Sequence, residues 1–173
     1  LFLTALLPPV QAKDALGALG APPVIPGEEA FQVLLVADNL TGAVLYQKGA
    51  EAPQPLLGGA VRWMTALTAL DYLSPDDMVT IGETPVLPLG ARLIGLRRNR
   101  SLTVRDLSAA MLIYCAQDAA VVLAEAALQE AGSDDFVALM NQKAAALGMT
   151  HTTYKEATGS GDTEQVTTAT DQL

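Results

Sequence analysis

A run of apolar residues that follows two glycines places the strongest constraint on how this chain folds. Residues 55–73 read Pro-Leu-Leu-Gly-Gly-Ala-Val-Arg-Trp-Met-Thr-Ala-Leu-Thr-Ala-Leu-Asp-Tyr-Leu. Apolar side chains recur there at steps of three residues, at Val61, Met64, Leu67 and Leu70. This spacing is close to the helical period and predicts an apolar face. We therefore expect a loop that runs into a buried helix, which ends at Ser74 because Pro75 disfavours helical angles in the residue before it.

The composition predicts a folded domain with an acidic surface. Of the 173 residues, 50% are hydrophobic, and Asp and Glu outnumber Lys and Arg by 19 to 10. A nucleic-acid partner is excluded on this ground, because it would require a basic stripe. No cofactor or metal is expected, since one Cys and one His are too few for a typical zinc site. Gly58-Gly59 also lacks the Lys-Ser/Thr that completes a phosphate-binding loop.

The first thirty residues are expected to precede the folded domain. Residues 1–12 end in Val10-Gln11-Ala12, a small-x-small cleavage site after an apolar run, and are interpreted as the remnant of a signal peptide. An exported, extracytoplasmic protein follows from this interpretation; the alternative is a short apolar N-terminal helix. Residues 13–30, rich in Ala, Gly and Pro, predict a linker or an extended lead-in. One domain is then expected over residues 31–173.

Strands are predicted on both sides of this helix. Residues 31–38 predict a buried strand and residues 43–47 a second strand that returns beside it. The turn at residues 38–42 contains Gly42, which would supply the unusual backbone angles. Residues 76–81 predict a further short strand.

Three more helices follow in the sequence. The first begins at Thr103, with Asp106 in its first turn and an apolar stripe at Val104, Leu107, Met111 and Tyr114. The second covers residues 118–131 and ends at Gly132. Ser133 is expected to cap the third, whose apolar face would contain Phe136, Met140 and Leu147.

Several segments, taken in order, resemble the serine-type D-alanyl-D-alanine carboxypeptidases, the low-molecular-weight penicillin-binding proteins. They are the hairpin from Asp38 to Tyr46, Met64-Thr65-Ala66-Leu67, Leu102-Thr-Val-Arg-Asp-Leu107, Asp118-Ala119-Ala120, Leu139-Met140-Asn141 and Leu147-Gly148-Met149. The resemblance covers residues 31–173. It implies an α+β, beta-lactamase-like fold, with an N-terminal antiparallel hairpin, a mainly helical subdomain and an incomplete sheet. It also implies a role in peptidoglycan metabolism.

The resemblance fails at the positions that carry the family's chemistry. The family places a Ser nucleophile and, three residues on, a Lys that takes its proton; one helical turn sets the two side by side. Gly59 and Arg62 stand at these positions. Gly59 has no oxygen to attack with, and the guanidinium of Arg62 stays protonated. Ser-x-x-Lys acyl transfer is therefore expected to be absent.

A second motif is altered in the same way. The family's Ser-x-Asn, which relays protons and holds the substrate amide, corresponds to Cys115-x-Gln117. Gln keeps the amide one methylene further out, and Cys is a weaker hydrogen-bond partner than Ser. The family's third motif, Lys-Thr-Gly on a strand, would lie beyond Leu173. Either the protein lacks that strand or the sequence is part of a longer chain, which is the interpretation we prefer.

Three functions follow as hypotheses. The first is an inactive homologue that binds a peptidoglycan stem peptide or a cell-wall enzyme, with Arg62 and Gln117 as its binding residues. The second is an active peptidase that uses Cys115, the only thiol, with His151, the only imidazole. The third is a purely structural interaction module, in which Arg62 would fill the cleft rather than pair with a substrate carboxylate. The basic run Arg97-Arg98-Asn99-Arg100 is expected to be a solvated loop, with an anionic partner as the alternative.

Overall fold

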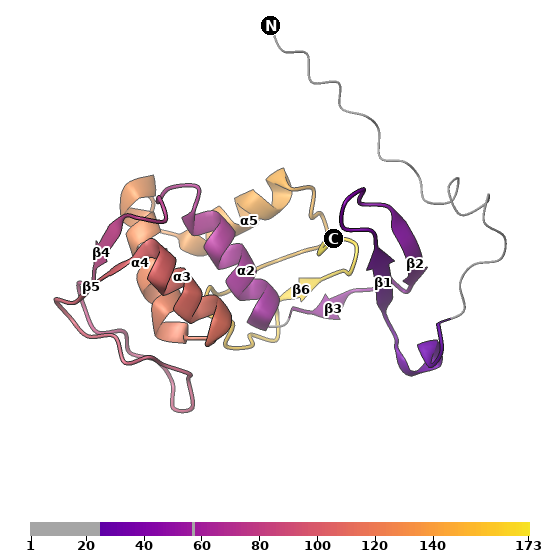
Figure 1. The fold of residues 1–173 in the computed structure, drawn as a ribbon, viewed down its shortest axis with the longest axis horizontal. Helices are drawn as coiled ribbons and strands as arrows, with labels where there is room; N and C mark the ends of the chain where they lie inside the picture. The colour runs from indigo at the N-terminus through magenta and orange to yellow at the C-terminus, as the bar shows by residue number, and fades with distance from the viewer. Residues whose placement is uncertain (1–24, 57) are drawn as a thin grey trace, which may run out of the picture. The chain divides into compact units, whose positions relative to one another are not determined.

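The structure, a computed structural model, describes residues 25–56 and 58–173 (Figure 1). The predicted signal-peptide remnant and all but the end of the predicted linker lie outside the described residues. Contacts divide the chain into two units: the residues up to Pro53 together with Thr168–Leu173, and Gln54–Thr167. The prediction of one domain over residues 31–173 stays a prediction.

The first unit is built on a β-hairpin. β1 (Leu34–Ala37) pairs antiparallel with β2 (Val44–Lys48), so that Leu34 lies opposite Lys48. The residues of both strands are half-buried or exposed, so the prediction that the first strand is fully buried was wrong. A 3-10 turn, η1 (Glu28–Ala30), closes the predicted lead-in, and the Lys48 ammonium donates to the Glu28 carbonyl at 2.8 Å.

The turn of this hairpin forms at the residues predicted for it. One Asp38 carboxylate oxygen accepts hydrogen bonds from the Leu40 amide, the Thr41 amide and the Thr41 hydroxyl. Gly42 has a φ of 70°, in the left-handed region that favours glycine. The Asp38 hydrogen bonds and the Gly42 conformation are both local to the turn, and they stabilise the reversal of the chain.

The second unit packs four helices around a common core. The helices are α2 (Gly58–Ala69), α3 (Val104–Ile113), α4 (Gln117–Ala131) and α5 (Phe136–Ala146). Two short antiparallel ladders complete it: β3 (Gln54–Pro55) with β6 (Val166–Thr167), and β4 (Met78–Thr80) with β5 (Ser101–Thr103). α2 contacts each of the other three helices (Figure 1). The fold is thus α+β, as predicted.

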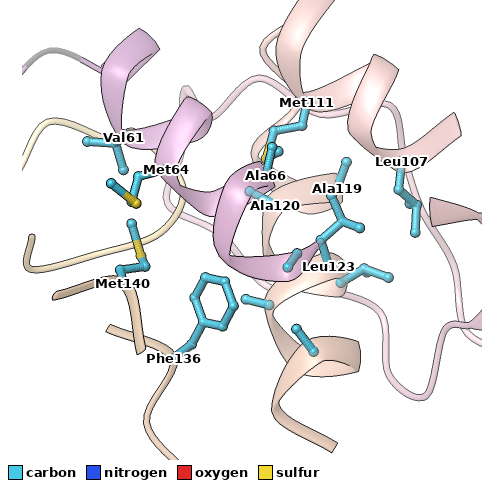
Figure 2. Packing of buried hydrophobic residues seen from close by; sticks show 14 of the residues in the cluster. Val61, Met64, Ala66, Leu107, Met111, Ala119, Ala120, Leu123, Phe136 and Met140 are labelled. Atoms are coloured by element: carbon cyan, nitrogen blue, oxygen red, sulfur yellow. The ribbon is translucent and has the colours of Figure 1, made fainter. Parts of the chain in front are cut away.

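The core confirms that α2 is the central helix, but it corrects which side of α2 is buried. Val61 and Met64 are buried, and Met64 lies close to Met140 and Phe136 of α5 (Figure 2). Leu67 and Leu70 are 45% and 43% exposed, so their predicted burial was wrong. Each step of three residues turns the side chain by about 60° around the helix, and the predicted stripe therefore drifts off the buried face.

The small residues of α2 make its contact with the other helices instead. The additional buried positions are Thr65, Ala66, Thr68 and Ala69. Short side chains let the backbones of two helices approach closely, and Ala119 and Ala120 of α4 are likewise fully buried near Ala66 (Figure 2). Leu107, Met111 and Leu123 belong to the same core.

The helix ends confirm some predicted caps and correct others. The Thr103 hydroxyl accepts from the Asp106 amide at 3.0 Å at the start of α3, and Gly132 ends α4 with a φ of 61°. The cap of α5 is Asp135, whose carboxylate accepts from the Ala138 amide, so the prediction for Ser133 was wrong. A carboxylate at the N-cap also interacts favourably with the helix dipole.

Two residues assigned to apolar stripes lie on the surface instead. Tyr114 is 53% exposed and Leu147 is 56% exposed. Each follows the last residue of its helix, where the chain has already left the buried face. The other residues of the two stripes are buried as predicted.

Candidate functional site

The two glycines at the start of α2 have different surroundings. Gly59, where the family resemblance predicts the nucleophile position, is exposed, and a Cβ built on it would meet no atom within 4 Å. A Cβ on Gly58 would lie 2.5 Å from the Gly159 carbonyl oxygen. The first turn of α2 therefore has room for a side chain at Gly59, whereas Gly58 is required for a close backbone approach.

Arg62 lies along the backbone that approaches Gly58. Its Nη1 donates to the Thr158 carbonyl at 3.4 Å, and a Cβ on Gly159 would come within 2.5 Å of the same nitrogen. One turn further along α2, the Thr65 hydroxyl donates to the Ala157 carbonyl at 2.7 Å. Arg62 is thus engaged with residues 158–159 and forms part of the contact between α2 and this loop.

The loop over residues 156–159 is held in shape by Glu156. One of its carboxylate oxygens accepts from the Thr158 amide, the Thr158 hydroxyl and the Gly159 amide, at 2.6, 2.6 and 2.9 Å. Its other oxygen accepts from the buried Gln165 side chain at 3.1 Å. The sequence analysis missed this role. The signal was an acidic residue two positions before Thr158-Gly159, a spacing typical of side chains that accept hydrogen bonds from a turn.

Cys115 and Gln117 lie on the turn between α3 and α4. Cys115 is half-buried and has a φ of 63°, an uncommon conformation for a residue with a side chain. Gln117 is the first residue of α4 and is also half-buried. Its backbone N–H donates to the Arg92 carbonyl at 2.8 Å. The structure thus places Gly59 and Arg62 near the start of α2, and Cys115 and Gln117 just before and at the start of α4. These two helices pack against each other.

Asp118 fixes the segment that runs beside this turn. It is 2% exposed, and its carboxylate accepts from the amides of Ile94, Gly95 and Leu96 at 3.2, 2.9 and 3.1 Å. A carboxylate in the first turn of a helix is also stabilised by the helix dipole. The sequence analysis noted Asp118 only as part of a matching segment; its position, directly after an altered motif at a helix start, was the available signal.

His151 is exposed on the segment that follows α5. Its Nδ1 lies 3.2 Å from the hydroxyl of its neighbour Thr150. The pairing of His151 with Cys115 stays a prediction. Over residues 25–56 and 58–173, no three His, Cys, Asp or Glu side chains gather as metal ligands would.

The sequence of this chain matches a known family. The family model described as D-alanyl-D-alanine carboxypeptidase matches residues 23–172. The chain belongs to this family. The match extends over both units of the structure, and it confirms the family inferred from the sequence.

Two relatives are about one-third identical to this chain over the residues that align. The D-alanyl-D-alanine carboxypeptidase DacD of Salmonella typhimurium is 32% identical in an alignment 164 positions long, which covers 88% of this chain and 40% of the relative. A D-alanyl-D-alanine endopeptidase of Pseudomonas aeruginosa is 33% identical over 126 residues, 72% of this chain and 40% of the relative. The chain thus spans about 40% of the length of these relatives.

Solved structures of the family have the same fold. A D-alanyl-D-alanine carboxypeptidase from Mycobacterium tuberculosis superposes with a TM-score of 0.69 at 31% identity, over 81% of this chain and 52% of the other. Penicillin binding protein 6B from Escherichia coli gives a TM-score of 0.72 at 25% identity, over 87% of this chain and 49% of the other. The family fold is therefore present here.

Within the described residues, no helix has the length and apolar character needed to cross a bilayer.

Proposed function

We propose that this chain is a catalytically inactive D-alanyl-D-alanine carboxypeptidase homologue that acts outside the cytoplasm and binds peptidoglycan stem peptides or a cell-wall enzyme. The observation that supports it is the first turn of α2. Gly59 is exposed and has no side chain, and Arg62 donates to the Thr158 carbonyl.

The chemistry of acyl transfer explains why these two residues matter. A nucleophile needs an oxygen or sulfur whose proton a neighbouring base removes. Gly59 has no such atom, and a guanidinium remains protonated at every pH at which proteins are folded. The space at Gly59 is open, so the missing hydroxyl would fit sterically. We infer that the substitution of Gly for Ser removes chemistry while it leaves the surrounding scaffold intact.

Binding would use groups that remain at the two helix starts. The Gln117 amide can donate and accept hydrogen bonds, and a guanidinium pairs with carboxylates such as the C-terminus of a D-Ala-D-Ala peptide. Arg62 donates to the Thr158 carbonyl through Nη1 and has further donors. Its two candidate roles, filling the site and binding a carboxylate, therefore lead to opposite effects when it is replaced.

Titration calorimetry with a short peptide that ends in D-Ala-D-Ala tests this proposal. We expect binding to the wild-type protein that is absent for the same peptide ending in L-Ala-L-Ala. Arg62→Ala and Gln117→Ala should each weaken binding, and Arg105→Ala, at an exposed arginine of α3, is the matched control. No binding by the wild type together with binding by Arg62→Ala would show that Arg62 fills the site.

The second candidate is a peptidase that uses Cys115. It is favoured by the left-handed conformation of Cys115 in the altered second motif, since strained backbone is common at functional sites. Peptide hydrolysis by the wild type that disappears in Cys115→Ala would establish it. In the absence of both hydrolysis and peptide binding, the structural interaction module would be the remaining hypothesis.

A further inference from the structure

The connection between β4 and β5 combines positive charge with exposed apolar side chains. Residues 84–100, here called the β4–β5 arm, contain four of the chain's ten Lys and Arg residues: Arg92, Arg97, Arg98 and Arg100. They contain no Asp or Glu, in a chain whose net charge is −9; Glu83 directly precedes the arm. The arm therefore carries four positive charges and no negative one, opposite in sign to the chain as a whole.

Two aliphatic side chains of the arm are almost fully exposed. Val86 is 96% exposed and Leu89 is 107% exposed, while Leu93 and Ile94 are each about two-fifths exposed. Beside the arm, Arg92 lies 5.8 Å above the ring of Tyr114, and Ile113 is 84% exposed. Exposed apolar side chains that share one chain segment with basic side chains make this segment a candidate interaction site.

The base of the arm is well fixed. The ladder of β4 and β5 continues into it, because the Ile81 amide donates to the Arg100 carbonyl at 2.8 Å. The Arg98 amide donates to the Thr84 hydroxyl at 3.1 Å, which ties the two sides together. Asp118 holds the amides of residues 94–96 against α4. The arm extends away from the helices on this base (Figure 1).

A pocket at this base is lined by two of the arginines. It has a volume of about 420 Å³, and Arg97, Arg100 and Ser101 line it together with backbone and aliphatic groups of residues 94–96 and Leu102. Arginine binds phosphate groups through its planar array of donors. The pocket therefore offers a place for an anionic headgroup beside apolar side chains.

We propose that the β4–β5 arm docks the protein onto an anionic lipid bilayer. Its arginines would contact the phosphate headgroups, while Val86 and Leu89 enter the boundary between headgroups and acyl chains. A dissolved anion would make no use of these aliphatic side chains, and an uncharged apolar surface would make no use of the arginines. A surface that is both anionic and apolar, as an anionic bilayer is, accounts for the two features together. This inference is independent of the proposed peptide binding.

Sedimentation with lipid vesicles tests the proposal. The wild-type protein should sediment with vesicles that contain phosphatidylglycerol, remain in solution with vesicles of phosphatidylcholine alone, and be released by high salt. Replacing Arg97, Arg98 and Arg100 together by Gln should weaken binding on the order of a hundredfold. Val86→Ser combined with Leu89→Ser should weaken it roughly tenfold.

Two matched variants serve as controls. Leu40→Ser removes an aliphatic side chain that is 93% exposed on the hairpin, and Lys155→Gln removes an exposed cation paired with Glu164. Both should bind as the wild type does, and circular dichroism should show that all variants are folded. Equal binding to both kinds of vesicle, binding by the triple Gln variant at the wild-type level, or no sedimentation with either vesicle would each overturn the proposal.

Discussion

The first turns of α2 and α4 show two different uses of the same structural position. At each of them a distant backbone segment lies against the start of a helix: residues 157–159 at α2 and residues 94–96 at α4. The segment at α4 is held by the buried carboxylate of Asp118. The segment at α2 is held by a backbone approach at Gly58 and by donors from Arg62 and Thr65.

This difference separates residues that hold the scaffold from residues that would act on a substrate. The Asp118 carboxylate accepts hydrogen bonds from the backbone amides of residues 94–96, and Asp118 stands in a segment that resembles the family. A Cβ built on Gly59 would meet no atom within 4 Å, so a side chain there would project into open space. A substitution at Gly59 therefore leaves the fold unaffected, whereas a substitution at Asp118 removes a support. Four predictions test this difference, in order of decreasing expected effect.

Replacement of Asp118 should have the largest effect. Asp118→Ala leaves three backbone amides without their acceptor in a buried place, and we expect the free energy of unfolding to fall by about 3 kcal/mol. Urea unfolding measures the loss, and hydrogen exchange should show lost protection at residues 94–96. Asp106→Ala, at an exposed residue of α3, is the control. A loss no larger than that of the control would remove the contrast between the two helix starts.

The adjacent glycines of α2 should respond in opposite directions. Gly58→Ala places a methyl group 2.5 Å from a backbone carbonyl, and overpacking of this kind costs about 2 kcal/mol. Gly59→Ala meets open space and should stabilise the helix by about 0.5 kcal/mol, because Ala is the better helix former. Thermal unfolding of both variants measures the difference. Similar destabilisation by the two changes would contradict the open space at Gly59.

Two buried threonines of α2 should differ in how their replacement by Val changes the free energy of unfolding, by a smaller amount than the two glycines. The Thr65 hydroxyl donates to the Ala157 carbonyl, so Thr65→Val should lower the free energy of unfolding by about 1 kcal/mol. The Thr68 hydroxyl is buried without a hydrogen-bond partner among the described residues. Thr68→Val should therefore be neutral or stabilising, because it removes an unsatisfied polar group. Destabilisation by Thr68→Val as large as that by Thr65→Val would contradict these assignments.

The smallest effect is expected at Asp38, an exposed counterpart of Asp118. Hydrogen bonds from the Thr41 hydroxyl and amide lower the pKa of Asp38 from its ordinary 3.8. Because the folded pKa is the lower one, this carboxylate stabilises the hairpin above pH 3.8, and the contribution is lost as the pH falls through the folded pKa. Thr41→Val should bring the pKa back toward 3.8. An NMR titration of the Asp38 carboxyl carbon measures it, and an unchanged pKa would be the contrary result.

Local patterns in the sequence predicted most of the secondary structure. The hairpin turn, the Thr103 cap of α3 and the Gly132 end of α4 each depend on residues within a few positions of one another, and all three are confirmed. The buried face of α2 was wrong at Leu67 and Leu70, because a strict step of three departs from the helical period over nine residues. The ladders β3–β6 and β4–β5 are two or three residues long, and their pairings join distant segments.

The candidate site was predictable only in part, for a similar reason. Gly59, Arg62, Cys115 and Gln117 were predicted as the motif positions because each stands inside a segment that otherwise resembles the family. The contact of Arg62 with residues 158–159 and the role of Glu156 in that loop depend on tertiary packing. No spacing within the sequence reports such contacts.

The loss of the nucleophile is tested most directly by intact-protein mass spectrometry after incubation with a penicillin. The expected mass of the wild-type protein is that of the unmodified chain, because no hydroxyl and base stand at Gly59 and Arg62. The double variant Gly59→Ser with Arg62→Lys, incubated in parallel, shows whether the open space accepts a working pair. A penicilloyl adduct on the wild-type chain, located by peptide mapping at Cys115 or at any other residue, would contradict the account of an inactive homologue.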